Sequence, residues 1–421
     1  MQTEVRVSNI NGIIKAPASK SCMQRALALA LLARGRSVIN NPSFCDDSLS
    51  AMSMAEDLGA LVEREDGSVA VTGNGIPSPV KNVINCGESG LAARLFIPVS
   101  ALCDQEISIQ GRGTLLSREM KHFSEPLKEL GVEFDSPSGF LPVRVKGPLQ
   151  GGRVSIDGSM SSQFLSGLLI ALPLTQSESS IEVDRLNSKP YVDLTVEMMK
   201  MAGVQVINNG YRMFFIKAGQ KYHPFSYTVE GDWSGASLFM VLGAIRGKIT
   251  ITGLDIDSYQ ADRKIINLLS DIGATVKVSR KAITISSSGL RPFRFDASQA
   301  PDLVPSMVVL ALACEGRSEI SNISRLRMKE SDRIVSLYGM VRSLGGKVTE
   351  ESDSLIIEGG NALRGGVVES FNDHRIAMAA AAASILCNDN VIIRGTECIS
   401  KSYPDFMDHL ARAGGRITNK S

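Results

Sequence analysis

The sequence lacks the patterns of a membrane protein, a disulfide-stabilised secreted domain or a zinc site. No apolar run reaches the ~18 residues of a membrane-spanning helix, and the first six residues have neither the basic nor the apolar part of a signal peptide. The 7 cysteines are scattered and never spaced as Cys-x-x-Cys, which favours a reducing compartment. We therefore expect a cytoplasmic protein with no membrane partner.

An excess of either charge is also missing. Lys and Arg number 45 and Asp and Glu 44, so the net charge of +1 gives no overall attraction to nucleic acid. The glycine-rich phosphate loops of P-loop kinases and Rossmann dehydrogenases are absent in usable context. The 4 histidines lack metal-ligand spacing, so we predict no metal and no cofactor.

A repeat of about 70 residues organises the chain. In each copy a helical pattern ends at a glycine and is followed by alternating strands; these glycines are Gly59, Gly131, Gly203, Gly273, Gly345 and Gly414. Each copy has a second helix that is apolar nearly all round, which is typical of a buried helix. The second helices are predicted over 21–33, 89–102, 160–172, 234–245, 302–314 and 372–386. This alternation predicts an α/β protein.

The two ends of the chain complete one another. The sixth copy stops before its second strand, and the N-terminal pattern Val5-Arg6-Val7 matches Val143-Arg144-Val145 of the second copy. We therefore expect two domains of three repeats, 16–228 and 1–15 plus 229–421, joined by two crossings that permit hinge closure over a cleft. A single continuous solenoid would need polar capping repeats, and the sequence shows none.

Several predicted helices begin with a cation, where the helix dipole disfavours positive charge by some tenths of a kcal/mol. A bound anion reverses the sign of that cost, because free N–H groups, the dipole and a guanidinium together bind phosphate or carboxylate. Any one cation is readily explained as a solvated surface charge, but the recurrence favours a site for several anionic groups. The cations are Lys20, Arg25, Arg94, Arg118, Lys189, Lys329, Arg333, Arg375 and Lys401.

From end to end the chain resembles the 5-enolpyruvylshikimate-3-phosphate (EPSP) synthase family, also called 3-phosphoshikimate 1-carboxyvinyltransferases. The motifs that carry the resemblance stand in family order. They are Ser19-Lys20-Ser21 with Arg25, Asp157-Gly158-Ser159 with Ser161-Ser162-Gln163-Phe164, Ser188-Lys189-Pro190-Tyr191, Pro301-Asp302, Lys329-Glu330-Ser331-Asp332-Arg333, Asn372-Asp373-His374-Arg375 and Lys401-Ser402-Tyr403-Pro404-Asp405.

The resemblance implies two inside-out α/β domains, each of three βαβαββ units, joined by a double-crossing hinge. It also implies transfer of the enolpyruvyl group of phosphoenolpyruvate to the 5-hydroxyl of shikimate 3-phosphate, with release of phosphate, on the pathway to chorismate and the aromatic amino acids. The implied partners are small anionic substrates. We expect a monomer, because the sequence has neither a heptad run nor an obvious apolar surface patch.

The same resemblance implies two sets of binding residues. For shikimate 3-phosphate they are Lys20, Ser21, Arg25, Ser161, Ser162, Gln163, Ser188, Tyr191, Asp302, Arg325 and Lys329. For phosphoenolpyruvate they are Lys20, Gly90, Arg118, Gln163, Arg333, Arg375 and Lys401. Together the two sets contain most of the cations at helix starts.

The implied reaction needs a base for the 5-hydroxyl and an acid for C3 of phosphoenolpyruvate. The candidates are Asp302, Glu330 and Lys20, with His374 added because it lies in a charged cluster. Asp302 suits the hydroxyl, while Glu330 or Lys20 could protonate carbon, and the sequence leaves these roles open. Asp302 by itself could also be an ordinary helix cap.

Some positions depart from the family pattern. The loop Gly87-Glu88-Ser89-Gly90-Leu91 stands where many relatives have Gly-Asn-Ala-Gly-Thr, and Leu95, Glu119 and Arg325 replace frequent Pro, Pro and Asn. We therefore expect activity to be kept, with an altered affinity for phosphoenolpyruvate and altered sensitivity to glyphosate, its competitor in this family. An inhibition curve matching that of a relative with the usual loop would contradict the second expectation.

Three alternatives remain. UDP-N-acetylglucosamine 1-carboxyvinyltransferases share the fold and chemistry, but the loop where they usually carry a reactive cysteine is here Gly111–Arg118, which has none. A non-catalytic anion-binding paralogue would be favoured by loss of Asp302 or Glu330, and both are present. An RNA-phosphate-processing enzyme finds little support in a net charge of +1.

Overall fold

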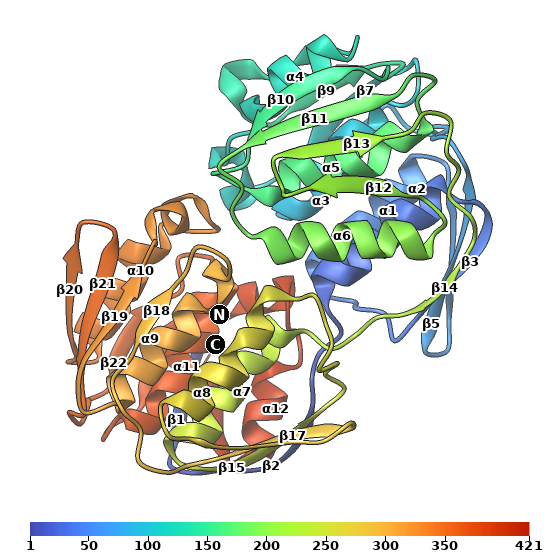
Figure 1. The fold of residues 1–421 in the computed structure, drawn as a ribbon. Helices are drawn as coiled ribbons and strands as arrows, with labels where there is room; N and C mark the ends of the chain where they lie inside the picture. Colours follow the sequence, from blue (N-terminus) through green and yellow to red (C-terminus); the bar gives the residue numbers. More distant parts are fainter. Residues whose placement is uncertain (421) are drawn as a thin grey trace. The chain divides into compact units, whose positions relative to one another are not determined.

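The computed structural model describes residues 1–420, which divide by their contacts into two units. Unit 1 comprises Met1–Pro17 and the chain from Glu230 onward, and unit 2 comprises Ala18–Val229. Figure 1 shows both units with their helices and strands labelled. Each unit is described separately below.

Three four-stranded sheets make up the strands of each unit, and all six sheets share one topology. The first two strands of each are parallel and the following pairs antiparallel. In unit 2 they are β14 (Ser226–Thr228), β3 (Arg34–Asn40), β5 (Ser68–Asn74), β4 (Leu61–Glu65); β6 (Val83–Asn85), β7 (Glu106–Gln110), β9 (Val143–Lys146), β8 (Glu133–Asp135); and β10 (Arg153–Asp157), β11 (Ser179–Asp184), β13 (Met213–Ile216), β12 (Val206–Asn209). In unit 1 they are β2 (Ile10–Lys15), β15 (Gly247–Thr252), β17 (Ala282–Ser286), β16 (Thr275–Val278); β18 (Arg294–Asp296), β19 (Gly316–Ser321), β21 (Ser354–Gly359), β20 (Lys347–Glu351); and β22 (Gly366–Glu369), β23 (Val391–Arg394), β1 (Gln2–Val7), β24 (Gly415–Lys420). The six-fold repeat predicted from the glycine spacing is therefore confirmed.

The helices that are apolar all round form the core of each unit. They are α1 (Lys20–Leu32), α3 (Gly90–Ser100) and α5 (Ser162–Ala171) in unit 2, and α7 (Trp233–Ile245), α9 (Val304–Ala313) and α11 (His374–Ala383) in unit 1. In unit 2 α3 contacts both α1 and α5, and in unit 1 all three contact one another (Figure 1). Every residue of α3 and α11 is buried, as expected for a helix with no polar face.

The other helix of each repeat, which precedes the repeat glycine, is amphipathic or short. These helices are α2 (Asp46–Asp57), α4 (Ser124–Glu129), α6 (Lys189–Met201), α8 (Ile265–Asp271), α10 (Arg333–Ser343) and α12 (Phe406–Arg412). The predicted repeat glycines follow their C-terminal ends with φ between 78° and 119°, a left-handed conformation that glycine adopts without steric cost. The described 3-10 helices are η1 (Gly113–Ser117), η2 (Lys121–Phe123), η3 (Pro137–Gly139), η4 (Leu172–Leu174), η5 (Ala261–Lys264), η6 (Pro301–Leu303), η7 (Ser324–Met328), η8 (Ser384–Leu386) and η9 (Thr396–Lys401).

The first strands of the chain belong to the sheets of unit 1. β1 lies between β23 and β24, antiparallel to both, so that Gln2 is opposite Lys420. β2 runs parallel to β15. The N-terminal segment thus supplies an internal strand to the sheet of the sixth repeat and an edge strand to the sheet of the fourth. Among residues 1–420, no helix is both long and apolar enough to cross a membrane.

Two isoleucines of β2 give a matched test of this arrangement. Ile10 is fully buried and Ile13 is 74 % exposed. We expect Ile10→Ala to lower the free energy of unfolding by about 2 to 5 kcal/mol because it leaves a cavity, and Ile13→Ala to change it by less than about 0.5 kcal/mol. Urea denaturation of both variants measures this difference, and equal midpoints would contradict the packing of β2 in unit 1.

Candidate functional site

A buried arginine at the start of α10 holds three carboxylates together in unit 1. Arg333 is 1 % exposed. Its Nη1 donates to Asp302 Oδ1 (2.8 Å), its Nη2 to Glu330 Oε2 (2.6 Å) and its Nε to Asp373 Oδ2 (2.8 Å). Burial by itself would lower the pKa of Arg333, but the three carboxylates outweigh it and raise that pKa. Arg333 therefore keeps its positive charge.

Asp302 lies in η6, directly before α9, and contacts two further cations. Lys329 Nζ is 3.3 Å from Asp302 Oδ1, and Arg375 Nη2 is 3.5 Å from Asp302 Oδ2. Burial would raise the pKa of Asp302, but Arg375, Lys329 and Arg333 together lower it well below its usual range. With 26 % of its side chain exposed, Asp302 is an ionised carboxylate that a ligand can reach.

Lys329 is the cation of this cluster that loses its proton most readily. Burial lowers its pKa to about 8, against the opposing effect of Asp302. Arg325, on η7, donates from Nη2 to Ser298 O. Burial lowers the pKa of Arg325, and the opposing effect of Asp302 is smaller. Arg325 and Lys329 are thus both within the electrostatic reach of Asp302.

The start of α11 brings the remaining predicted residues of unit 1 together. Asp373 caps the helix by accepting from the backbone N–H of Arg375 (2.9 Å), and Arg375 Nη1 donates to Asp302 O (3.4 Å). Lys401, at the end of η9, donates from Nζ to Asn372 O (2.7 Å). His374 is 1 % exposed and its Nδ1 lies 3.9 Å from Asp373 Oδ1, so its ring faces the interior of unit 1.

A second buried arginine defines the corresponding group in unit 2. Arg25 of α1 is 1 % exposed, and it donates to Thr195 Oγ1 (2.8 Å), Ser21 O (3.0 Å) and Tyr191 O (3.3 Å). These acceptors are all neutral, and burial lowers the pKa of Arg25. Within residues 1–420 no carboxylate lies at ion-pair distance from it, so an anionic ligand would supply the missing counter-charge.

Two more cations of unit 2 lie near the beginnings of the core helices. Lys20 Nζ, in the first turn of α1, donates to Asp47 Oδ2 (2.8 Å). Arg94 Nη1 donates to Gln163 Oε1 (2.8 Å). Their side chains are largely buried. A cation at a helix start interacts unfavourably with the helix dipole. Each of these two cations has a hydrogen-bond partner on another element.

Gly90 is needed where it stands because Arg118 packs against it. A Cβ built on Gly90 would lie 2.7 Å from Arg118 Nη1, so the guanidinium is in contact with the first turn of α3. Arg118 is 7 % exposed. This contact places a positive charge at a helix N-terminus, where backbone N–H groups also favour an anion.

The predicted hydroxyl groups lie at the starts of α5 and α6. Ser161 caps α5 by accepting from Gln163 N (3.3 Å), and Ser162 is its first residue. Ser188 precedes α6 with a left-handed φ of 54°, and Tyr191 lies in the first turn of that helix. The structure thus collects the predicted residues into two groups, one in each unit.

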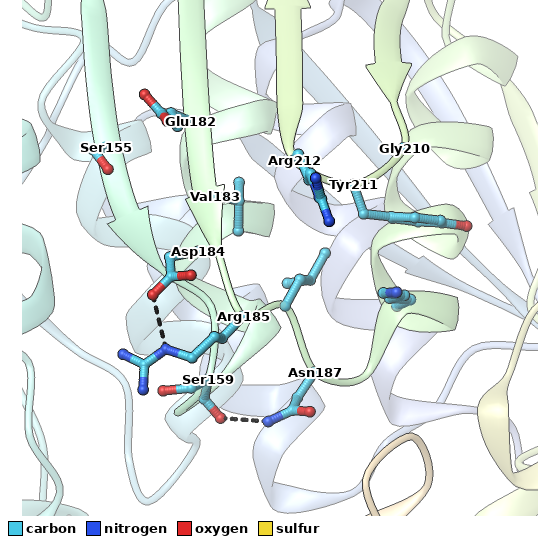
Figure 2. Close-up of a pocket in the computed structure, with 12 residues that line it drawn as sticks. Ser155, Ser159, Glu182, Val183, Asp184, Arg185, Asn187, Gly210, Tyr211 and Arg212 are labelled. Atoms are coloured by element: carbon cyan, nitrogen blue, oxygen red, sulfur yellow. Dashed lines mark hydrogen bonds and ion pairs between the residues drawn. The ribbon is translucent and has the colours of Figure 1, made fainter.

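A pocket of about 790 Å³ lies beside the unit 2 group (Figure 2). It is lined by residues at the ends of β10 and β11, the turn between β12 and β13, and the start of α6. Asn187 donates to Ser159 O (2.9 Å) and Arg185 to Asp184 Oδ2 (2.8 Å) at its edge. None of the predicted binding residues lines it, although Ser159 and Lys189 adjoin them in sequence. The candidate site is therefore formed by the charged groups and not by this pocket.

The sequence prediction missed partners that belong to other elements. Asp47, which pairs with Lys20, and Asp373, which pairs with Arg333, were not among the predicted site residues. Asp373 had a detectable signal, since it stands inside the Asn372–Arg375 motif at a helix start. Asp47 had none, because its pairing with Lys20 joins two helices 27 positions apart. Among residues 1–420 no group of His, Cys, Asp or Glu side chains is placed to hold a metal ion.

Chemically, the unit 1 group combines three carboxylates with several cations, and the unit 2 group combines buried cations with hydroxyls. Carboxylates can move protons, and the cations can hold anionic groups in place and stabilise developing negative charge. The two groups therefore suit acid–base chemistry on anionic substrates.

The chain is similar to known proteins over nearly its whole length. The family model for EPSP synthase (3-phosphoshikimate 1-carboxyvinyltransferase) matches residues 5–410. Proteins named 3-phosphoshikimate 1-carboxyvinyltransferase from Clostridium kluyveri and Clostridium acetobutylicum are 39 % and 38 % identical, with 98 % and 97 % of this chain and 97 % and 96 % of theirs covered.

Solved structures show the same fold. An EPSP synthase from Acinetobacter baumannii matches with a TM-score of 0.84 and 25 % identity, covering 100 % of both chains. The enolpyruvyl transferase NikO from Streptomyces tendae matches in fold with a TM-score of 0.80 and 16 % identity, covering 99 % of this chain and 98 % of that one. The fold is that of the enolpyruvyl transferases. Within that class, the chain belongs to the EPSP synthase family.

The buried ion pairs of Arg333 predict a stability difference between two capping aspartates. We expect Asp373→Ala to lower the free energy of unfolding by about 3 to 5 kcal/mol, because it removes one partner of a buried pair and a helix cap. Asp332→Ala, which removes the cap of α10 at a partly exposed position, should cost about 1 kcal/mol. Denaturation curves of the two variants provide the measurement, and equal losses would contradict the central role of the Arg333 cluster.

Proposed function

We propose that the chain transfers the enolpyruvyl group from phosphoenolpyruvate to the 5-hydroxyl of shikimate 3-phosphate and releases phosphate. One observation carries this proposal beyond family membership: Arg333 holds Asp302 and Glu330 in one cluster with Lys329 and Arg375. Two carboxylates among several cations suit proton transfer on polyanionic substrates. The curated relatives carry the name of this reaction, which favours it over transfer to UDP-N-acetylglucosamine.

Shikimate 3-phosphate is proposed to contact residues of both groups. The buried Arg25, whose acceptors in unit 2 are all neutral, would bind its phosphate together with hydroxyl and amide groups. The proposed residues are Lys20, Ser21, Arg25, Ser161, Ser162, Gln163, Ser188, Tyr191, Asp302, Arg325 and Lys329.

Phosphoenolpyruvate is proposed to bind mainly through guanidinium and ammonium groups. Arg333 and Arg375 both contact Asp302, and Arg118 lies at the start of α3 beside Gly90. The proposed residues are Lys20, Gly90, Arg118, Gln163, Arg333, Arg375 and Lys401.

The proposed acid–base step follows from the charge balance around Asp302. Three cations keep its pKa low, which makes it ionised but only weakly basic. An anion that binds Arg333 and Arg375 would oppose part of that effect and raise the pKa of Asp302, so that it can accept the 5-hydroxyl proton. Glu330, bonded to the same Arg333, or Lys20 would then protonate C3 of phosphoenolpyruvate. The buried His374 would act through its neighbours in the cluster.

We further propose that the chain works as a cytoplasmic monomer without a nucleic-acid or membrane partner. Its 7 cysteines are all free thiols, which supports a reducing compartment. We also propose domains at 16–228 and at 1–15 plus 229–421. The division of contacts near Pro17 and Val229 supports these boundaries.

Phosphate release by the purified protein tests the proposed reaction. With phosphoenolpyruvate present, we expect release with shikimate 3-phosphate and none with UDP-N-acetylglucosamine. Asp302→Asn and Glu330→Gln should each lower kcat at least ~100-fold, because each removes a proton-transfer group. Glu358→Gln, at an exposed pair with Lys347, is the control and should leave kcat unchanged. Phosphate release with UDP-N-acetylglucosamine would support a UDP-N-acetylglucosamine 1-carboxyvinyltransferase. Absence of phosphate release with both substrates would support a non-catalytic binding protein.

The lowered pKa of Lys329 predicts a pH dependence of substrate binding. As pH rises from 7 to 9 Lys329 passes through its pKa of about 8 and loses its charge, so the KM for shikimate 3-phosphate should rise several-fold. The phosphate group itself is already largely dianionic above pH 7. Lys329→Arg, which stays charged, should flatten this part of the profile. An equally steep rise in that variant would assign the effect to another group.

A further inference from the structure

A buried threonine on α6 joins the three helices that carry the proposed shikimate 3-phosphate residues of unit 2. Thr195 is 1 % exposed. Its Oγ1 is bonded to Arg25 of α1 (2.8 Å), to Ser166 of α5 (3.0 Å) and to the carbonyl of Tyr191 one turn earlier in α6 (2.8 Å). Helices α1, α5 and α6 carry labels in Figure 1, and α6 contacts the other two.

The direction of each of these hydrogen bonds is fixed by proton counting. A threonine hydroxyl has one proton and two acceptor lone pairs. That proton goes to Tyr191 O, and Arg25 Nε can only donate, so Ser166 must be the donor in its bond to Thr195. The Thr195 oxygen therefore has its full set of three partners, which leaves it one orientation.

This saturated oxygen determines how the Arg25 guanidinium lies. The guanidinium has five N–H groups, of which three are used by Thr195, Ser21 and Tyr191. Within the described residues, one N–H on Nη1 and one on Nη2 remain for a ligand. Because a guanidinium is planar, the bond from Nε to Thr195, together with the bonds from Nη1 and Nη2, fixes the plane in which both remaining groups point.

Packing alone gives little reason for a threonine here. Threonine is a weak helix former, and its hydroxyl bond to the carbonyl four residues back is slightly destabilising. A valine of the same shape would fill the position. The hydroxyl is explained by the bonds that it makes to Arg25 and Ser166.

We propose that Thr195 is a positioning residue for shikimate 3-phosphate: it holds the Arg25 guanidinium in the orientation that binds the substrate's anionic group. This rests on the proposed function. Thr195 itself does not touch the substrate and acts through Arg25, and through Tyr191 and Ser166 it fixes the starts of α6 and α5 relative to α1.

The test compares two substitutions at one position. Thr195→Val keeps the shape and removes the hydroxyl, and we expect it to raise the KM for shikimate 3-phosphate about 10- to 100-fold, the effect of losing a hydrogen bond to a charged group. The kcat and the KM for phosphoenolpyruvate should stay near the wild-type values. Thr195→Ser keeps the hydroxyl and loses the methyl group, and should restore the KM.

A purely structural role predicts the opposite ranking, since packing is preserved by valine and damaged by serine. Thr175→Val is the matched control: Thr175 is also buried in unit 2 and bonds only backbone carbonyls, at 2.8 and 3.0 Å, so this variant should leave the KM unchanged. An unchanged KM in Thr195→Val, or equal losses in both Thr195 variants, would overturn the proposal.

Two further measurements keep the test decisive. Titration calorimetry with shikimate 3-phosphate alone should show the same loss of affinity for Thr195→Val. If that variant does not fold, Ser166→Ala should raise the KM about three- to tenfold, and no change would overturn the proposal. Absence of turnover in the wild-type protein would instead refute the proposed function, before any variant is compared.

Discussion

A guanidinium ion leaves water only where acceptors replace its hydration, and this constraint organises both groups of the candidate site. Arg333 meets it with three carboxylates, and Arg25 meets it with neutral oxygen atoms. The first arrangement gives a charge-balanced cluster that fixes Asp302 and Glu330. The second leaves a buried positive charge that an anion would balance. The proposed acid–base group and the proposed anion-binding group are thus built around the same kind of residue.

The repeat explains how such residues come to lie at helix starts. Every core helix follows the edge strand of a parallel pair, and the backbone N–H groups of its first turn have no partners within the helix. Where a cation joins them, as Lys20 does in α1 and Arg375 in α11, the local electrostatic cost is compensated by partners from neighbouring elements. The fold supplies the positions, and the sequence of each repeat decides which of them bind anions.

The pKa shifts in unit 1 connect the charges around Asp302 with the proposed function. Asp302 is ionised because three cations face it, and two of them, Arg333 and Arg375, are proposed ligands of phosphoenolpyruvate. Substrate binding would therefore change the basicity of Asp302 without any movement of its side chain. Lys329, whose pKa is about 8, loses its charge at moderately alkaline pH, whereas the guanidinium groups keep theirs.

The sequence by itself determined the repeat, the buried helices and the family, and it predicted the charged residues of the candidate site, because each of these depends on local patterns: the glycine at a helix end, an apolar helix face, a cation beside a cap. Only the tertiary structure decided the partners. Lys20 and Asp47, Arg333 and Asp373, and Arg25 and Thr195 lie on different elements. No local pattern encodes such pairs, since their contact depends on how strands and helices distant in the chain pack against one another.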